Sequence, residues 1–136
     1  MNNNFTYHMP TKIVFGNYAF KKINKFVNGR RTLLITSKGF VGRGIVDETK
    51  SLTGSIVAVI SEVKSHPEFQ DLKIMYNKIK EMDFEVILAI GGGSVLDVAK
   101  FLSVYNSKKE YQFVEDITKG NIPKKDYNLI PIISVP

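Results

Sequence analysis

The chain has 136 residues, of which 43% are hydrophobic and 24% are charged, the balance typical of one water-soluble domain with a single core. Its 19 Lys and Arg outnumber its 13 Asp and Glu, but the cations are scattered and never form the cluster that a nucleic-acid-binding groove needs. The lack of cysteine excludes disulfides and thiolate metal sites, and no apolar stretch approaches the ~20 residues that span a bilayer. We expect a cytoplasmic protein without a nucleic-acid or membrane partner.

Two short apolar runs come first in the chain, at residues 5–7 and 12–15. Aromatic and β-branched residues favour extended chain, so we expect these runs to form a β-hairpin or an edge strand ahead of the main sheet. His8 lies between them and is expected to be an ordinary surface residue.

Four later runs rich in β-branched residues predict the strands of the main sheet. They occupy residues 32–36, 55–60, 85–90 and 129–135. Near-continuous hydrophobicity without alternation is typical of strands buried on both faces of a parallel sheet.

Segments with helical spacing separate these strands, because their apolar residues recur three and four positions apart. The expected helices span residues 18–27 and 44–52, then begin just after Pro67 and again at Gly93. The third helix is expected to place residues 69, 72, 75, 76, 79 and 82 on one side.

Strands and helices therefore alternate, which predicts an α/β fold with a doubly wound, mostly parallel, Rossmann-like sheet. The polar stretch at residues 107–127 is expected to hold a short helix at 112–117 and a loop at 119–125. The last expected strand has no following helix to cover the sheet, and the functional crevice of such sheets lies at the carboxyl ends of the strands. We therefore expect the chain to be a fragment of a longer protein.

Residues 90–100, IGGGSVLDVAK, carry the clearest chemical signal. Three glycines join a buried strand to a helix, so the backbone can turn sharply and no Cβ shields its amides. The first N–H groups of the helix and the positive end of its dipole then form a site for a phosphate or pyrophosphate. Ser94 either caps the helix or donates its hydroxyl to the same oxygens.

Two interpretations of this segment stay open at this point. It is either an anion site or an ordinary glycine-rich turn followed by a weak surface pair, Asp97 with Lys100. Its spacing differs from the dinucleotide fingerprint G-x-G-x-x-G and from the P-loop, which ends in G-K-[ST]. Three consecutive glycines destabilise an unliganded chain, which favours the binding site.

The decapeptide at residues 91–100 resembles a signature of the iron-containing (group III) alcohol dehydrogenase family, within the superfamily of glycerol dehydrogenase and dehydroquinate synthase. It matches every defined position of G-G-G-S-x-x-D-x-A-K. Residues 10–16, PTKIVFG, are similar to the family's entry segment, and residues 130–136, IPIISVP, are similar to the strand that precedes its T-T-A-G-T-G-S-E loop.

The resemblance implies that residues 1–136 are the nucleotide-binding domain of such an enzyme. A C-terminal helical domain, absent from this chain, would hold the iron or zinc ion, so we expect no metal ligand and no catalytic residue here. The two histidines, His8 and His66, form no H-x-x-x-H pair. Members of the family are often dimers that pair near the N-terminal strand, so a homodimer is expected.

The resemblance also implies a dinucleotide cofactor, NAD or NADP. Its pyrophosphate would lie on the backbone N–H groups of Gly92, Gly93, Ser94 and Val95. Ser37 and Lys38 follow the first strand, where an acid that hydrogen-bonds the adenosine ribose commonly stands. Loss of that anion and gain of a cation favour NADP(H) over NAD(H), unless Lys38 simply faces solvent.

Two further positions are assigned by the resemblance. His66-Pro67 stands where relatives have Asn-Pro, beside the adenosine site, so His66 either contacts the ribose or base or faces solvent. Asp97 is expected near the nicotinamide end, where its carboxylate would orient the cofactor or a water without acting as the catalytic acid.

The expected function is that of an oxidoreductase, an NAD(P)-dependent and metal-activated enzyme that interconverts a small alcohol and an aldehyde or ketone. This chain by itself is expected to be inactive. One alternative is a stand-alone nucleotide- or phosphate-binding module without redox chemistry. Another is a relative with glycerol-(phosphate) dehydrogenase or dehydroquinate synthase activity.

Overall fold

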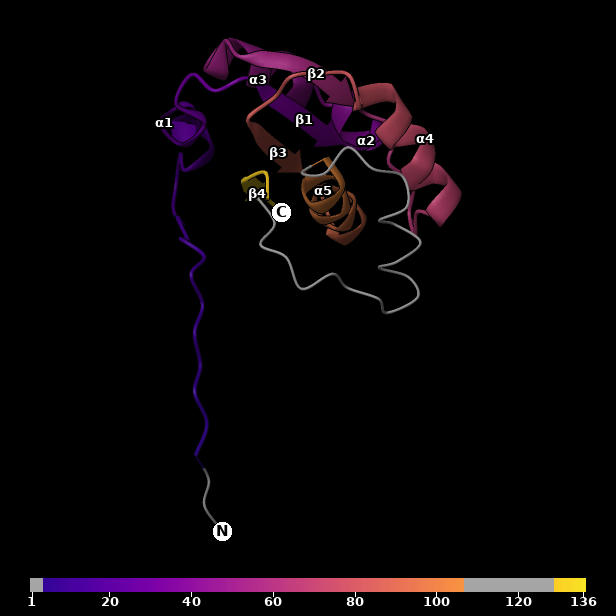
Figure 1. Cartoon of the computed structure of the whole chain (residues 1–136). Helices are drawn as coiled ribbons and strands as arrows, with labels where there is room; N and C mark the ends of the chain where they lie inside the picture. Colours follow the sequence, from indigo (N-terminus) through magenta and orange to yellow (C-terminus); the bar gives the residue numbers. More distant parts are fainter. Residues whose placement is uncertain (1–3, 107–128) are drawn as a thin grey trace.

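A four-stranded parallel sheet forms the centre of the computed structural model, which describes residues 4–106 and 129–136 (Figure 1). Its strands are β1 (Thr32–Thr36), β2 (Ile56–Ile60), β3 (Val86–Ile90) and β4 (Ile132–Val135). They lie side by side in the order β2-β1-β3-β4. Every residue of β1 and β3 is buried, as continuous apolar runs require. The predicted α/β class and parallel sheet are confirmed.

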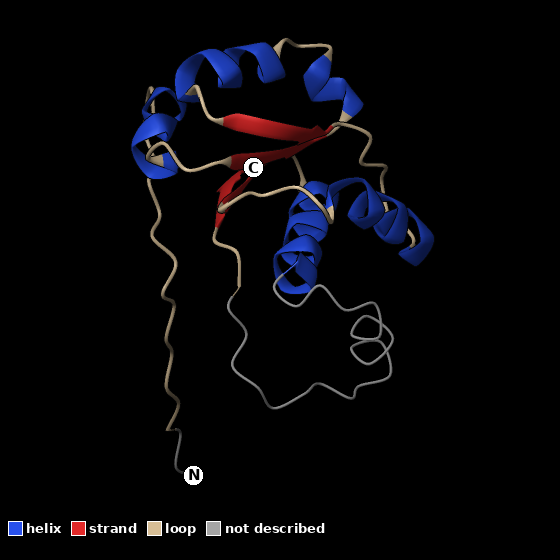
Figure 2. Ribbon diagram, turned by 45° about the horizontal axis from the view of Figure 1, so that its top comes forward, coloured by secondary structure: helices blue, strands red, loops and turns tan. Residues whose placement is uncertain are grey.

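Helices cover both faces of this sheet (Figure 2). One face carries the 3-10 helix η1 (Phe20–Lys22) and the α-helices α1 (Ile23–Val27), α2 (Lys38–Val41) and α3 (Ile45–Thr53). The other face carries α4 (Phe69–Ile79) and α5 (Gly93–Asn106).

Side chains that alternate along the strands divide the core in two. Leu33 and Ile35 pack toward α4 and α5, whereas Leu34, between them, packs toward α1 and α3. The register of the sheet repeats this division, because Leu34 lies opposite Leu88 and Leu88 lies opposite Ile133. The period of two residues thus fills both cores from the same strands.

The four expected strands of the main sheet and the four expected helices are present, with shifts at their ends. The third expected helix ends at Ile79, so Met82 lies beyond it with 44% of its surface exposed, and the prediction that Met82 shares one side of this helix is wrong. The short helix α2 was not expected, because four residues that include Gly39 give no helical periodicity. The helix expected at 112–117 and the loop at 119–125 lie outside the described residues.

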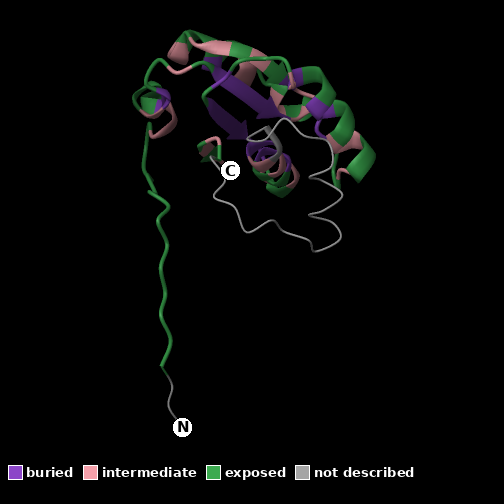
Figure 3. Ribbon diagram, viewed as in Figure 1, coloured by how far each residue is buried: buried purple, intermediate pink, exposed green. Residues whose placement is uncertain are grey.

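The expected N-terminal hairpin or edge strand is not formed. Residues 4–15 belong to no strand, and Figures 1 and 3 show this segment running away from the sheet with its surface exposed. Phe5 and Phe15 are 90% and 100% exposed. An extended segment becomes a strand only when a neighbouring strand accepts and donates its backbone hydrogen bonds, and within the described residues no strand pairs with it.

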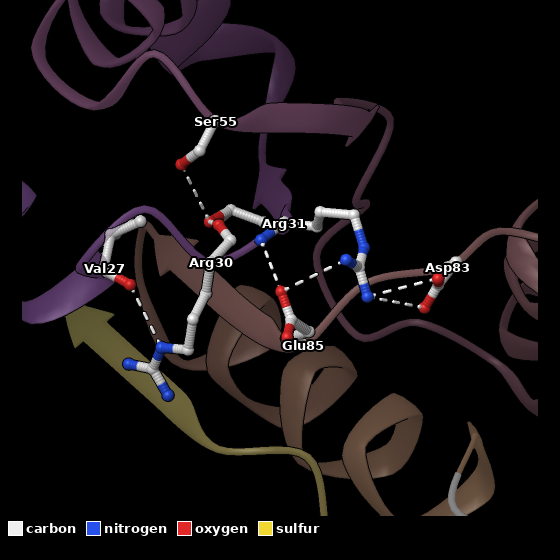
Figure 4. A network of polar contacts seen from close by, with 7 residues as sticks. Val27, Arg30, Arg31, Ser55, Asp83 and Glu85 are labelled. Atoms are coloured by element: carbon white, nitrogen blue, oxygen red, sulfur yellow. Dashed lines mark hydrogen bonds and ion pairs between the residues drawn. The ribbon is translucent and has the colours of Figure 1, made fainter.

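A polar network joins β1 and β3 where they begin, at the amino edge of the sheet (Figure 4). The Arg31 guanidinium lies 3.1 Å from the Asp83 carboxylate and 3.6 Å from that of Glu85. The Arg31 backbone N–H also donates to the Glu85 carboxylate at 3.0 Å. These contacts align the starts of the two central strands. The glycine segment, residues 91–93, lies at the opposite side of the sheet, where the strands end.

Within the described ranges, no helix is long and apolar enough to cross a membrane.

Candidate functional site

The glycine segment begins with a residue that the fold itself requires. Gly91 follows β3, is buried, and has φ of 149°, a conformation that residues with a Cβ rarely adopt. A Cβ added there would lie 2.8 Å from Cγ2 of Val95. Gly91 is therefore needed for the turn from strand to helix, whether or not a ligand binds.

The next two glycines have a different environment. Gly92 and Gly93 are exposed, and a Cβ added to either would meet no atom within 4 Å. Packing therefore does not explain the absence of side chains at these positions. Their backbone faces open space, which is the arrangement that lets a ligand approach main-chain amides closely.

Only some of the backbone N–H groups at the start of α5 have a hydrogen-bond acceptor among the described residues. The N–H groups of Val95 and Leu96 both donate to the Gly92 carbonyl, at 3.0 and 3.2 Å. The N–H groups of Gly93 and Ser94 have no acceptor among residues 4–106 and 129–136, as expected for the first turn of a helix. Val95 is buried and its N–H already bonds to the Gly92 carbonyl; its contact with a pyrophosphate stays a prediction.

Ser94 and His66 meet at this helix start. The His66 backbone N–H donates to Oγ of Ser94 at 3.3 Å, so the loop between β2 and α4 touches the glycine segment. His66 has φ of 51°, in the left-handed region that is unusual for a residue with a side chain. Because Ser94 Oγ accepts this bond, its own hydrogen remains able to donate to a ligand oxygen.

The loop after β1 lies beside the loop after β3. The last pair of these strands is Thr36 with Ile90, and the buried Thr36 hydroxyl donates to the Ile90 carbonyl at 2.8 Å. Ser37 and Lys38 come next in the chain and line a groove of about 810 Å³ that extends between β2 and α4. Lys38 is exposed, and no ion pair joins it to another described residue.

Asp97 is placed less favourably for a role in a site. Its carboxylate forms an ion pair with Lys100 at 3.1 Å, and both side chains are more than two-thirds exposed. Exposed pairs of this kind contribute little to stability. For these two side chains the geometry is that of the simple surface pair, the alternative left open by the sequence.

The structure thus brings most of the predicted residues to one edge of the sheet. Gly92, Gly93 and Ser94 form the helix start, His66 touches Ser94, and Ser37 with Lys38 lies on the adjacent strand end. Sequence reasoning missed Glu62, which lines the same groove as Lys38. Its position after the second strand is a signal that could have found it. In the part of the chain that the structure describes, no three His, Asp or Glu residues gather into a potential metal site.

Known proteins match most of the chain. A family profile described as iron-containing alcohol dehydrogenase matches residues 10–136. The NADPH-dependent aldehyde reductase YqhD of Escherichia coli is 32% identical over 104 residues, which cover 74% of this chain and 27% of the reductase. The probable NADH-dependent butanol dehydrogenase 2 of Bacillus subtilis is 31% identical over 106 residues, or 74% of this chain and 27% of that protein.

Solved structures agree with these sequence matches. The iron-containing alcohol dehydrogenase of Thermococcus thioreducens superposes with a TM-score of 0.81 at 25% identity, covering 96% of this chain and 36% of that one. The chain spans about a third of the length of the structures it matches. Because the profile covers 127 of the 136 residues, counted from 10 to 136, this chain belongs to the iron-containing alcohol dehydrogenase family.

Proposed function

We propose that this chain is the nucleotide-binding domain of an NAD(P)-dependent oxidoreductase that interconverts an alcohol and an aldehyde or ketone. The observation that carries this proposal is the start of α5, where the free N–H groups of Gly93 and Ser94 lie beside glycines that face open space. Two free amides at the positive end of a 14-residue helix suit the charge and size of a pyrophosphate.

Each residue of the site has a proposed task in holding the dinucleotide. Gly92 and Gly93 let the pyrophosphate approach the backbone, Gly93 and Ser94 donate to its oxygens, and the Ser94 hydroxyl adds a third donor. Ser37, Lys38 and His66 would lie along the adenosine half. When bound, the nicotinamide would supply the hydride acceptor or donor, and these residues would set the position of its ring by holding the rest of the cofactor.

We also propose that NADP(H) is preferred over NAD(H). Lys38 is an exposed cation at the end of β1 with no ion-pair partner in the described ranges, and Ser37 replaces the acid that would repel a 2′-phosphate. The relatives are named for both cofactors, with NADPH for the E. coli reductase and NADH for the B. subtilis dehydrogenase. Cytoplasmic location, assembly as a homodimer and a placement of Asp97 near the nicotinamide stay predictions.

The family's metal is assigned to residues other than those the structure describes. The described histidines and carboxylates form no cluster of three that fits a metal ion. We therefore propose that the part of the protein seen here positions the cofactor, and we assign it no step in activating the alcohol.

Titration of the purified chain with NADPH and NADH tests the proposal. Cofactor fluorescence or calorimetry should show saturable binding of both, tighter for NADPH, and Lys38→Met should weaken NADPH binding while leaving NADH binding nearly unchanged. Circular dichroism would verify that each sample is folded. If a folded sample binds neither cofactor, the proposed function is wrong.

A further inference from the structure

The groove beside β2 and α4 contains charged residues other than Lys38 that have no task in the proposed function. Lys38 at the start of α2 lines it together with Glu62 from the loop after β2 and Lys78 from helix α4. The Lys78 ammonium donates to the Glu62 carboxylate at 3.1 Å. With Lys64 and Asp71, three lysines and two carboxylates of the described residues thus line one groove of about 810 Å³.

The cations of this groove are not equivalent. Lys64 is bonded to Asp71 at 2.8 Å and Lys78 is bonded to Glu62 at 3.1 Å. Lys38 is the groove lysine without an ion-pair partner among the residues that the structure describes. The groove therefore offers an incoming anion one unpaired positive charge.

Sheet order decides which part of a dinucleotide would reach these residues. The glycine segment follows β3, Lys38 follows the neighbouring strand β1, and Glu62 follows β2 at the edge. Adjacent strands lie ~4.8 Å apart, so the ends of β3 and β2, two strands apart, are offset by roughly 10 Å across the sheet. An adenosine ribose whose phosphate rests on α5 would extend across this offset, which would bring its 2′ position toward Lys38 and Glu62.

Glu62 is the residue that opposes a phosphate at this position. The hydrogen bond from Lys78, with the charges of Lys78 and Lys38, lowers the pKa of the Glu62 carboxyl below its ordinary value of 4.5, so Glu62 is ionised at neutral pH. An ionised carboxylate accepts a hydrogen bond from a ribose 2′-hydroxyl and repels a 2′-phosphate. Glu62 alone would thus favour NAD(H), against the preference that Lys38 supports.

We propose that the Lys78–Glu62 pair is a specificity-determining element, in which Lys78 occupies and neutralises Glu62 so that the groove accepts the 2′-phosphate of NADP(H) at Lys38. This inference rests on the proposed function, because it assumes that a dinucleotide binds across this edge. In it, Lys78 is a positioning residue that acts through Glu62 and makes no contact with the phosphate.

The test is the ratio of the NADPH and NADH dissociation constants, since the two ligands differ only in the 2′-phosphate. Lys78→Met should shift this ratio toward NADH by about three- to fivefold, because Glu62 is then left unpaired to repel the 2′-phosphate, in a pair whose side chains are more than half exposed to screening solvent. Glu62→Gln should shift it toward NADPH. Lys73→Met is the matched control, because Lys73 is an exposed α4 lysine outside the groove lining, and it should leave the ratio unchanged.

The double variant separates a relayed effect from a direct one. If Lys78 acts through Glu62, adding Lys78→Met to Glu62→Gln should change the ratio by less than about twofold. An equal effect of Lys78→Met in both backgrounds would show that Lys78 acts on the phosphate by its own charge or contact and not through Glu62, and would overturn the proposal, as would an unchanged ratio in the single variant. If the folded, unmutated chain bound neither cofactor, the proposed function itself would be refuted.

Discussion

At the scale of single residues, the structure distinguishes three glycines that look equivalent in the sequence. Gly91 is confined by its positive φ and by Val95, so its role belongs to the fold. Gly92 and Gly93 have no such restriction, so their role is better explained by a ligand. A single motif thus combines a structural requirement with a binding requirement.

Alanine substitutions should separate these two roles. Gly91→Ala should destabilise the fold by about 1–3 kcal/mol, because the new Cβ forces a shift of Val95 or of the turn. Gly92→Ala should change stability by less than about 0.5 kcal/mol and weaken NADPH binding by roughly tenfold, or about 1.4 kcal/mol, because its Cβ occupies the space proposed for the pyrophosphate.

Urea unfolding measures the change in stability of each variant, and calorimetric titration measures the change in NADPH affinity. Each variant serves as the control of the other. Undiminished NADPH affinity in Gly92→Ala would show that the phosphates do not lie over this residue, and wild-type stability in Gly91→Ala would show that the turn adapts.

At the scale of elements, helix α4 begins with a reciprocal capping arrangement. The Glu68 side chain accepts from the backbone N–H of Asp71, and Asp71 Oδ2 accepts from the Glu68 N–H at 3.1 Å. Asp71 also accepts from Lys64 at 2.8 Å. This arrangement holds the start of α4 next to the His66 loop, so an element end far from the glycines in sequence supports the candidate site.

The stability of α4 should therefore depend on pH through Asp71. The hydrogen bond from Lys64, then that from the Glu68 N–H, lowers the pKa of Asp71 below its ordinary value of 3.8. A carboxyl whose pKa is lowered by folding stabilises the protein above its unfolded-state pKa, and this contribution is lost as the pH falls through the folded-state pKa. The unfolding temperature should consequently fall as the solution is acidified below about pH 4.

Asp71→Asn provides the comparison, because asparagine can still accept the Glu68 N–H but does not titrate. Its unfolding temperature should be lower than that of the wild type at pH 7 and should fall less between pH 5 and pH 2. Circular dichroism melts at stepped pH give both curves. Parallel curves for the two proteins would mean that Asp71 contributes nothing to the acid sensitivity.

At the scale of the whole molecule, the chain exposes much apolar surface. Phe5, Phe15 and Ile13 in the N-terminal segment are at least 70% exposed, and Figure 3 shows this segment as exposed along its described length. A second groove, of about 560 Å³, lies between this segment, η1 and α1 on one side and β4 on the other. Surface of this kind favours association.

We expect the isolated chain to self-associate in a concentration-dependent way. Replacement of Phe5 and Phe15 by serine should reduce the apparent mass measured by light scattering, because these are the most exposed large apolar side chains of the described residues. Their lack of core contacts means that the unfolding temperature should not change. A monodisperse monomer at all concentrations of the unmutated chain would contradict this expectation.

Much of this architecture could be predicted from local patterns. The bounds of β1 were predicted without error, because five consecutive apolar or β-branched residues indicate burial on both faces. The start of α5 at Gly93 followed from the glycines before it. Burial and helix boundaries leave such signals because they depend on neighbours only a few residues away in the chain.

Other features were decided only when distant segments met. His66 and Ser94 are 28 residues apart in sequence, and their contact depends on the left-handed conformation of His66. The Glu62–Lys78 pair likewise forms only where the loop after β2 meets α4. The bond from the Val95 N–H to the Gly92 carbonyl depends on the conformation of the first turn of α5. The N-terminal strand was predicted wrongly for the same reason, since composition shows that a segment can extend but not whether another strand lies beside it. Periodicity reports the environment of one segment, whereas contacts between segments are a property of the complete fold.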